Sequence, residues 1–185
     1  AVGFAKASRR RSTLACTASI GPGSTNMVTG AATATINHLP VLLLVSDSYA
    51  SRHQGVVMQQ LEHPSAGDIT VNDCLRPVSR FFDRINRPEQ LLTALPEAMR
   101  VLTDPVETGA VTISIPQDVT THAYDFPSRF FETRVWRIER APAPPARLDE
   151  LADLLATARR PVVIAGGGVH YSDASAELAE FAELY

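Results

Sequence analysis

The sequence lacks most of the patterns that would assign it directly to a common class of protein. Its 185 residues include only two cysteines, Cys16 and Cys74, which form no CxxC pair and are too few for a disulfide framework. No apolar run is long enough to cross a bilayer, and no signal peptide opens the chain. The formal net charge of −3 provides no basic surface for nucleic acid or anionic membranes. We therefore expect a cytoplasmic protein with neither nucleic-acid nor membrane partners, because few cysteines suit a reducing compartment.

Motifs for several kinds of catalysis are missing as well. The five histidines form no HxxxH or HExxH pattern, so we expect no zinc site. Neither Ser19 nor Ser24 stands in a GxSxG nucleophile elbow. The run Gly166-Gly167-Gly168 lacks the third glycine of a dinucleotide fingerprint, because Tyr171 occupies that position. A close-packed turn is favoured for this run, with a flavin or another phosphate group near a helix N-terminus as the alternative.

The most informative segment that is present is the loop Thr17–Asn26, with the sequence TASIGPGSTN. It follows an apolar run and precedes a segment rich in alanine and glycine, which is typical of a strand, a tight turn and a helix. Such turns lie at the carboxyl ends of strands, where open α/β sheets bind ligands. In Gly21-Pro22-Gly23 the glycines lack a Cβ and the proline fixes φ, so a ligand could approach a pre-organised backbone. Asn26 is the expected side-chain hydrogen bonder, and a purely structural turn is the alternative.

Strand and helix patterns alternate along most of the chain, which predicts an α/β fold with a mostly parallel sheet and helices on both faces. Continuous apolar runs are typical of parallel strands, and apolar residues three to four positions apart indicate helices. Asn86-Arg87-Pro88-Glu89 resembles a capping box that begins one of these helices. The expected strands are 12–17, 41–45, 78–82 and 109–116; the expected helices are 1–8, 24–37 and 88–102, with loops and short helices over 49–76.

A segment rich in proline and aromatic residues divides the chain into two domains. We expect residues 124–147 to be a linker that is packed against other parts of the protein, because its prolines alternate with phenylalanines and a tryptophan. Residues 1–123 would then form the first domain. Residues 148–185 would be the first βα portion of a second α/β domain, with a buried strand over 161–165. Because the sequence begins with a helical pattern that has no cap, we expect it to be part of a longer protein.

Five segments in register resemble the thiamine-diphosphate-dependent enzymes of the acetohydroxyacid-synthase-like group. They are Gly3–Ala7, Gly21–Asn26, Pro40–Leu44, Gly109–Val119 and Pro161–Val169. The resemblance implies that residues 1–123 are a pyrimidine-binding domain without its N-terminal part, and that a central domain follows. It also implies catalysis with thiamine diphosphate, which serves as an electron sink while a C–C bond breaks.

The resemblance also assigns roles to individual residues. It implies that Gln59 or Gln60 is a catalytic glutamine that approaches the substrate, and that an activating glutamate lies upstream of Ala1. Magnesium would bind outside this chain, and FAD, which some relatives hold, is not favoured. The active site would form between two subunits, so we expect a homo-oligomer and an inactive isolated chain. The residues matched to the cofactor-binding loop are Gly21, Pro22, Gly23 and Asn26.

Within this group, the stretch Gln59–Asp68 most resembles hydrolases of inositol catabolism that open a cyclic 1,2-dione to 5-deoxy-glucuronate. Acetohydroxyacid synthases show Phe-Gln-Glu where this chain has Met58-Gln59-Gln60-Leu61-Glu62, which argues against acetolactate synthesis. One alternative is an acetolactate synthase-like enzyme or 2-oxo acid decarboxylase that would bind a carboxylate through Arg52, Arg76 or Arg80. The other is a non-catalytic module that binds a nucleotide or flavin.

Overall fold

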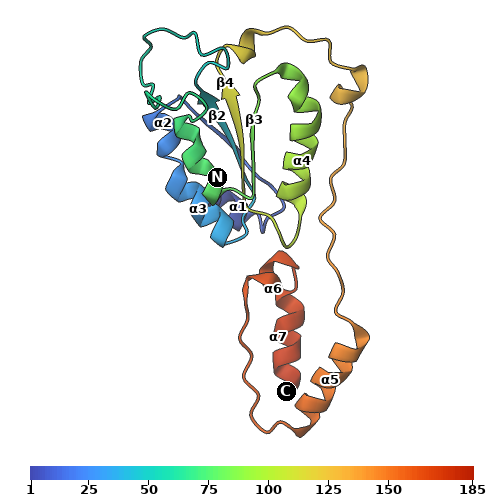
Figure 1. The fold of residues 1–185 in the computed structure, drawn as a ribbon. Helices are drawn as coiled ribbons and strands as arrows, with labels where there is room; N and C mark the ends of the chain where they lie inside the picture. The colour runs from blue at the N-terminus through green and yellow to red at the C-terminus, as the bar shows by residue number, and fades with distance from the viewer. The chain divides into compact units, whose positions relative to one another are not determined.

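Four parallel strands form the sheet of the first unit in the computed structural model, which describes all of residues 1–185 (Figure 1). The strand order is β1-β2-β4-β3, and Val41 of β2 lies opposite Ala110 of β4. Because all four strands are parallel, their carboxyl ends lie along one edge of the sheet. The elements of this unit, with 3-10 helices labelled η, are α1 (Val2–Ala7), β1 (Ala15–Ala18), α2 (Pro22–Thr25), α3 (Val28–Ile36), β2 (Val41–Asp47), η1 (Val71–Val78), β3 (Phe81–Arg84), η2 (Pro88–Gln90), α4 (Leu91–Thr103), β4 (Ala110–Pro116), η3 (Val119–Thr121) and η4 (Ser128–Phe131).

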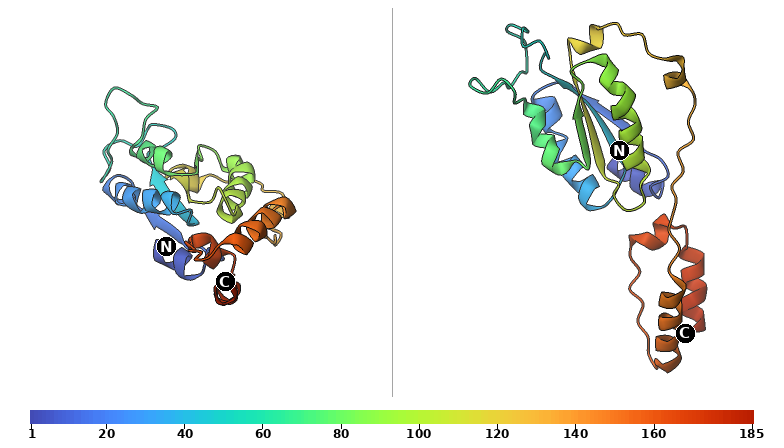
Figure 2. Two further views of the ribbon diagram at one scale, coloured as in Figure 1. Left: turned by 90° about the horizontal axis from the view of Figure 1, so that it is seen from below. Right: turned by 45° about the vertical axis from the view of Figure 1, so that its right-hand side comes forward.

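Helices cover both faces of this sheet, as the sequence predicts. Helix α4 packs on β3 and β4 from one side, and α3 and η1 contact β4 from the other side (Figures 1 and 2). The buried residues of α4 are Ala94, Ala98, Val101 and Leu102, and this spacing gives the helix one apolar stripe. The stripe meets buried side chains such as Ile113 of β4 to form the core. The expectation of an α/β fold with a mostly parallel sheet is therefore confirmed.

Several local predictions differ from the structure in where elements begin or end; strand β1, for example, is Ala15–Ala18 rather than 12–17. The helix expected over 24–37 is two helices, α2 and α3, with a break at Asn26–Met27. Strand β3 begins at Phe81 rather than at 78, because the 3-10 helix η1 extends to Val78. The cap before α4 lies one residue later than expected, since the backbone N–H of Arg87 donates to the side chain of Gln90 at 2.9 Å.

The aromatic residues of the expected linker pack within the first unit, which extends from Ala1 to Ile138. The rings of Phe126 and Phe130 stack with their centroids 5.0 Å apart. Phe130 and Trp136 line a cavity of about 280 Å³ together with Met99 and other residues of α4. The segment after β4 is therefore held against α4 by its aromatic side chains.

The second unit, Glu139–Tyr185, consists of three helices joined by loops. These helices are α5 (Pro145–Thr157), α6 (Gly167–Tyr171) and α7 (Ser175–Leu184). The strand expected over 161–165 is wrong for this structure: the segment is irregular, and Val162 and Ile164 are 87% and 93% exposed. A strand needs a neighbour for its backbone hydrogen bonds, and the second unit contains no other strand. No helix of either unit has the length and apolar character needed to span a membrane.

Candidate functional site

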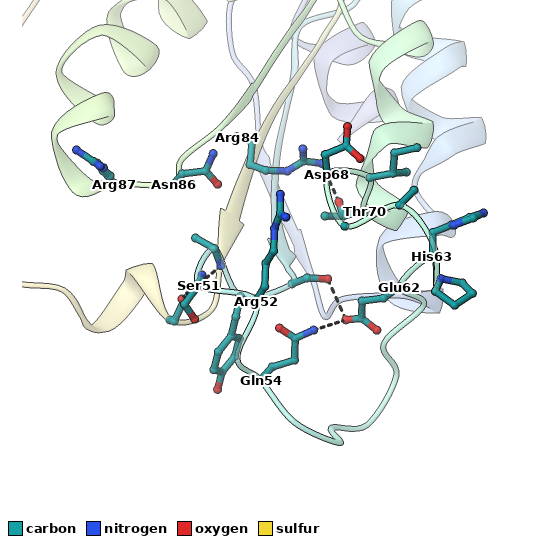
Figure 3. Close-up of a pocket in the computed structure, with 18 of the residues that line it drawn as sticks. Ser51, Arg52, Gln54, Glu62, His63, Asp68, Thr70, Arg84, Asn86 and Arg87 are labelled. Carbon is teal, nitrogen blue, oxygen red and sulfur yellow. Dashed lines mark hydrogen bonds between the residues drawn. The ribbon is translucent and has the colours of Figure 1, made fainter.

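A cavity of about 860 Å³ opens at the carboxyl edge of the sheet (Figure 3). Its wall is the long loop over residues 48–70, which we call the β2–η1 loop, together with residues that follow β3 and β4. This is the edge where parallel α/β sheets bind their ligands. The lining is rich in charged and polar groups, namely Ser48, Ser51, Arg52, Gln54, Glu62, His63, Asp68, Thr70, Arg84, Asn86, Arg87, Asp118 and His122.

A buried ion pair lies beneath the cavity and spans the central strand. Arg84, the last residue of β3, donates through Nε to Oδ2 of Asp47, the last residue of β2, at 2.7 Å. The side chain of Asp47 is fully buried and that of Arg84 is 14% exposed. Ser114 of β4, which lies between these strands, donates to the same carboxylate oxygen at 2.5 Å. The buried charge of Asp47 is thus neutralised and hydrogen-bonded, as a buried carboxylate requires.

Arg84 also reaches the beginning of η1 through its second nitrogen. Its Nη2 atom donates to Oγ1 of Thr70 at 2.7 Å and to Oδ2 of Asp73 at 3.0 Å. Burial lowers the pKa of Arg84, but the hydrogen bonds and charges of Asp47 and Asp73 outweigh this effect and raise it. Burial likewise raises the pKa of Asp73, but hydrogen bonds from Arg76, the Thr70 backbone and Arg84 together lower it below its usual value. Arg84 and Asp73 are therefore both charged at neutral pH.

Asp118 holds the other end of the β2–η1 loop. It follows β4, and its two carboxylate oxygens accept hydrogen bonds from the backbone N–H groups of Ala50 at 2.9 Å and Ser51 at 3.0 Å. Burial raises the pKa of Asp118, but these backbone hydrogen bonds outweigh it and lower the pKa below its usual value. The carboxylate thus keeps its charge and both of its hydrogen bonds to the loop at neutral pH.

Side chains within the loop form the rest of the cavity wall. Glu62 accepts hydrogen bonds from Ser48 at 3.0 Å and from Gln54 at 3.2 Å, which ties two distant parts of the loop together (Figure 3). The side chain of Arg52 points into the cavity toward Arg84 and makes no hydrogen bond or ion pair (Figure 3). The cavity therefore offers both acceptors and donors, including the unpaired guanidinium of Arg52.

The structure brings the predicted cofactor loop and the predicted catalytic glutamines together. Gly21 has a φ of +72°, and a Cβ built on it would lie 1.7 Å from the backbone oxygen of Gln59. A Cβ on Gly23 would lie 2.5 Å from Oγ of Ser19. Gly21 is therefore required by a backbone contact inside the chain, whereas at Gly23 rotation of the Ser19 hydroxyl could make room for a Cβ. We expected a ligand to approach the backbone of Gly21 closely. In the structure, the β2–η1 loop makes that approach.

The remaining predicted site residues lie around this contact, outside the 860 Å³ cavity. Pro22 and Asn26 are exposed, and the amide of Asn26 makes no hydrogen bond within the chain. Gln59 is exposed and Gln60 is half-buried, and neither side chain has a hydrogen-bond partner. Three free side-chain amides thus stand beside the turn, available to bind a polar ligand. No group of three or more histidine, cysteine, aspartate or glutamate side chains is arranged to hold a metal ion.

Comparison with known protein families explains why these segments occur together. Residues 1–66 match the model of the thiamine pyrophosphate enzyme N-terminal TPP binding domain, and residues 148–185 match that of the thiamine pyrophosphate enzyme central domain. Together the two matches span more than half of the chain. The chain belongs to the thiamine pyrophosphate enzymes. Thiamine pyrophosphate is another name for thiamine diphosphate, so the family resemblance found in the sequence is confirmed.

Curated relatives in this family match nearly the whole chain. The 3D-(3,5/4)-trihydroxycyclohexane-1,2-dione hydrolase of Clostridium perfringens is 52% identical over 182 residues, which are 98% of this chain and 28% of that protein. The proteins of the same name from Clostridium tetani and Bacillus cereus are 51% and 52% identical over 185 residues, all of this chain and 29% of each protein. The chain thus spans less than a third of the length of these relatives.

Sequence reasoning missed the three charged residues that organise this edge: Asp47, Arg84 and Asp118. One signal was visible, because each of them stands at or just after the end of a strand pattern, where polar residues face a ligand-binding edge. Their pairing was not visible, since it depends on the strand order β1-β2-β4-β3. That order places β2 and β3 on either side of β4.

We predict that Gly21→Ala displaces the β2–η1 loop. The new methyl group cannot coexist with the Gln59 carbonyl, and a φ of +72° strains any residue with a Cβ. Urea unfolding should show a loss of about 2 kcal/mol or more, as expected for strain at such a position. Gly30→Ala is the matched control, because a Cβ at this helical position has open space and should stabilise by up to about 1 kcal/mol. Equal changes in stability for both substitutions would contradict the contact between Gly21 and the Gln59 carbonyl.

A second prediction concerns the pH dependence of stability. Because the pKa of Asp73 is lowered in the folded state, its contribution is present above its unfolded pKa of about 3.9 and is lost as pH falls through the lower folded value. Asp73→Asn should therefore reduce stability to urea at pH 7 and make the decline below about pH 5 shallower than in the wild type. Asp125→Asn, at an exposed carboxylate without hydrogen bonds, is the control. If the stability of Asp73→Asn fell with decreasing pH as steeply as that of the wild type, the assignment of a lowered pKa to Asp73 would be refuted.

Proposed function

We propose that the full-length protein carrying this chain is a thiamine-diphosphate-dependent hydrolase that opens the ring of trihydroxycyclohexane-1,2-dione by C–C cleavage. The main support is that relatives bearing this hydrolase name are 51–52% identical across essentially the entire chain, including the β2–η1 loop. With this activity, the protein would act in inositol catabolism and form 5-deoxy-glucuronate. We place it in the cytoplasm as a homo-oligomer, and the two free cysteines, Cys16 and Cys74, agree with a reducing compartment.

The turn Gly21-Pro22-Gly23 and Asn26 would bind the aminopyrimidine side of the cofactor. Their fit rests on an exposed proline and on an exposed amide that has no partner within the chain. When bound, thiamine diphosphate supplies the electron sink that C–C cleavage requires. We propose that its magnesium ion is held by parts of the protein outside this chain. The amides of Gln59 and Gln60 would orient the reacting carbonyl by hydrogen bonding, because both are free and stand beside this turn.

The polar cavity suits a substrate of this chemistry. Three arginines and three carboxylates line it. Arg84 and Asp118 are occupied by their hydrogen bonds within the protein, so amides, hydroxyls and Glu62 remain to bind the hydroxyl groups of a substrate. A ring with three hydroxyls and two carbonyls presents both donors and acceptors, which such a mixed lining can satisfy.

One observation supports the alternative of a 2-oxo acid substrate. Of the three arginines proposed from the sequence, Arg76 pairs with Asp73 and Arg80 pairs with Glu107, whereas Arg52 is unpaired and lines the cavity. A carboxylate is the natural partner of such a free guanidinium. An acetolactate synthase-like enzyme or decarboxylase therefore remains the second candidate. The glycine run 166–168 gives little support to a flavin-binding module, because no strand precedes it and α6 has only five residues.

The assay that separates these candidates compares trihydroxycyclohexane-1,2-dione with pyruvate, using the purified full-length protein and added thiamine diphosphate. We expect turnover of the cyclic dione alone. Replacing both glutamines, in Gln59→Ala with Gln60→Ala, should lower kcat roughly 10²-fold, the typical effect of removing a hydrogen bond made in the transition state. Gln90→Ala is the control, since its amide is hydrogen-bonded in a helix cap and is not one of the free amides beside the Gly21 turn. Turnover of pyruvate without the dione would instead favour the second candidate.

A further inference from the structure

The β2–η1 loop is long, yet both of its ends are fixed by side chains from other strands. At the first end, Asp118 accepts hydrogen bonds from the N–H groups of Ala50 and Ser51, which lie 68 and 67 residues away in the sequence. At the second end, Arg84 donates to the hydroxyl of Thr70 while its Nε holds Asp47. These attachments lie at the ends of β4 and β3, which are rigid parts of the sheet.

The middle of the loop has few fixed contacts of its own. Glu62 ties Ser48 to Gln54, and the backbone oxygen of Gln59 lies against Gly21. The apolar side chains at its tip are exposed, with Val56 and Met58 among them. The loop therefore has no core of its own, and its shape depends on where its two ends are held.

We infer that Asp118 and Arg84 are positioning residues that act through the β2–η1 loop on Gln59 and Gln60. Asp118 fixes the position of the chain where it leaves β2, and Arg84 fixes its position where it enters η1, through the hydrogen bond to Thr70. Together they hold the two glutamines beside the turn at Gly21. Neither residue needs to touch the substrate for this role. The inference rests on the proposed function only for the effect on turnover, because the placement of the loop can be measured separately.

Limited trypsin digestion of the full-length protein measures that placement directly. Arg52 is exposed and is the only lysine or arginine between Asp47 and Arg76, so cleavage after it reports opening of this loop alone. Asp118→Ala removes the first attachment. Thr70→Val removes the hydrogen bond of Arg84 to the loop at the second end while leaving the ion pairs of Arg84 with Asp47 and Asp73 in place, which protects the fold. Each substitution should speed cleavage roughly 3- to 30-fold, the range produced by the loss of a capping group.

Asp104→Ala is the matched control for Asp118→Ala. Asp104 also accepts hydrogen bonds from two backbone N–H groups, those of Val106 at 2.8 Å and Glu107 at 2.7 Å. Its pKa is lowered by those same hydrogen bonds. It follows α4 and precedes β4, however, so it lies at the opposite edge of the sheet. This control should leave cleavage after Arg52 and the turnover number unchanged.

Turnover distinguishes positioning from a general effect on stability. We expect Asp118→Ala to lower kcat more than it raises KM, and Asp118→Asn, which keeps one acceptor oxygen, to recover part of the loss. In the double variant Gln59→Ala with Gln60→Ala, adding Asp118→Ala should have little further effect, because the groups that it positions are gone.

Fully additive losses, or wild-type cleavage after Arg52 in both Asp118→Ala and Thr70→Val, would overturn the inference. A wild-type protein inactive on the cyclic dione would refute the proposed function, while the digestion would still decide whether the loop is held.

Discussion

Arg84 and Asp47 form an ion pair across the central strand of the sheet, and the candidate site is built on it. The carboxylate of Asp47 is fully buried at the end of β2, where it would be strongly destabilising without a partner. The same guanidinium continues to Thr70 and Asp73, so one side chain links three segments that are distant in the sequence. Removing one member of such a buried pair typically costs about 3–5 kcal/mol, because the other charge is left uncompensated. The carboxyl edge of this sheet is thus fixed by electrostatics as much as by apolar packing.

Glycine at position 21 adds a steric constraint at the same edge. The backbone of the turn and that of the β2–η1 loop meet where any Cβ would stand, so the two segments can approach only because the side chain is absent. The result is an arrangement in which free amides of Asn26, Gln59 and Gln60 surround a rigid backbone contact. Unpaired polar side chains held beside a close backbone contact suit a ligand site, because the contact reduces the ordering that binding must supply.

The fold could be predicted from sequence much more fully than the site. Alternating apolar runs and helical spacing predicted the sheet and α4, because each depends on residues that are close in the sequence. The segment 161–165 has an equally apolar pattern but no strand neighbour in its unit, so local pattern alone misassigned it. The site depends on strand order and on side chains that meet groups up to 68 residues away in the sequence, such as Asp118 with Ala50, and no local pattern contains that information. Family resemblance suggested the roles proposed for the turn and the glutamines, whereas Asp118 and Arg84, which we infer to position them, emerged only from the geometry.

Hydrogen–deuterium exchange of the full-length protein, with and without thiamine diphosphate, tests the central claim that the cofactor lies against the Gly21 turn and the β2–η1 loop. Backbone amides of residues 19–26 and 57–62 should gain protection when the cofactor binds, because a bound ligand would stabilise both segments against local opening. The amides at the opposite edge, around Asp104 to Thr108, should exchange at an unchanged rate. Cofactor binding that leaves residues 19–26 and 57–62 unprotected would contradict the claim.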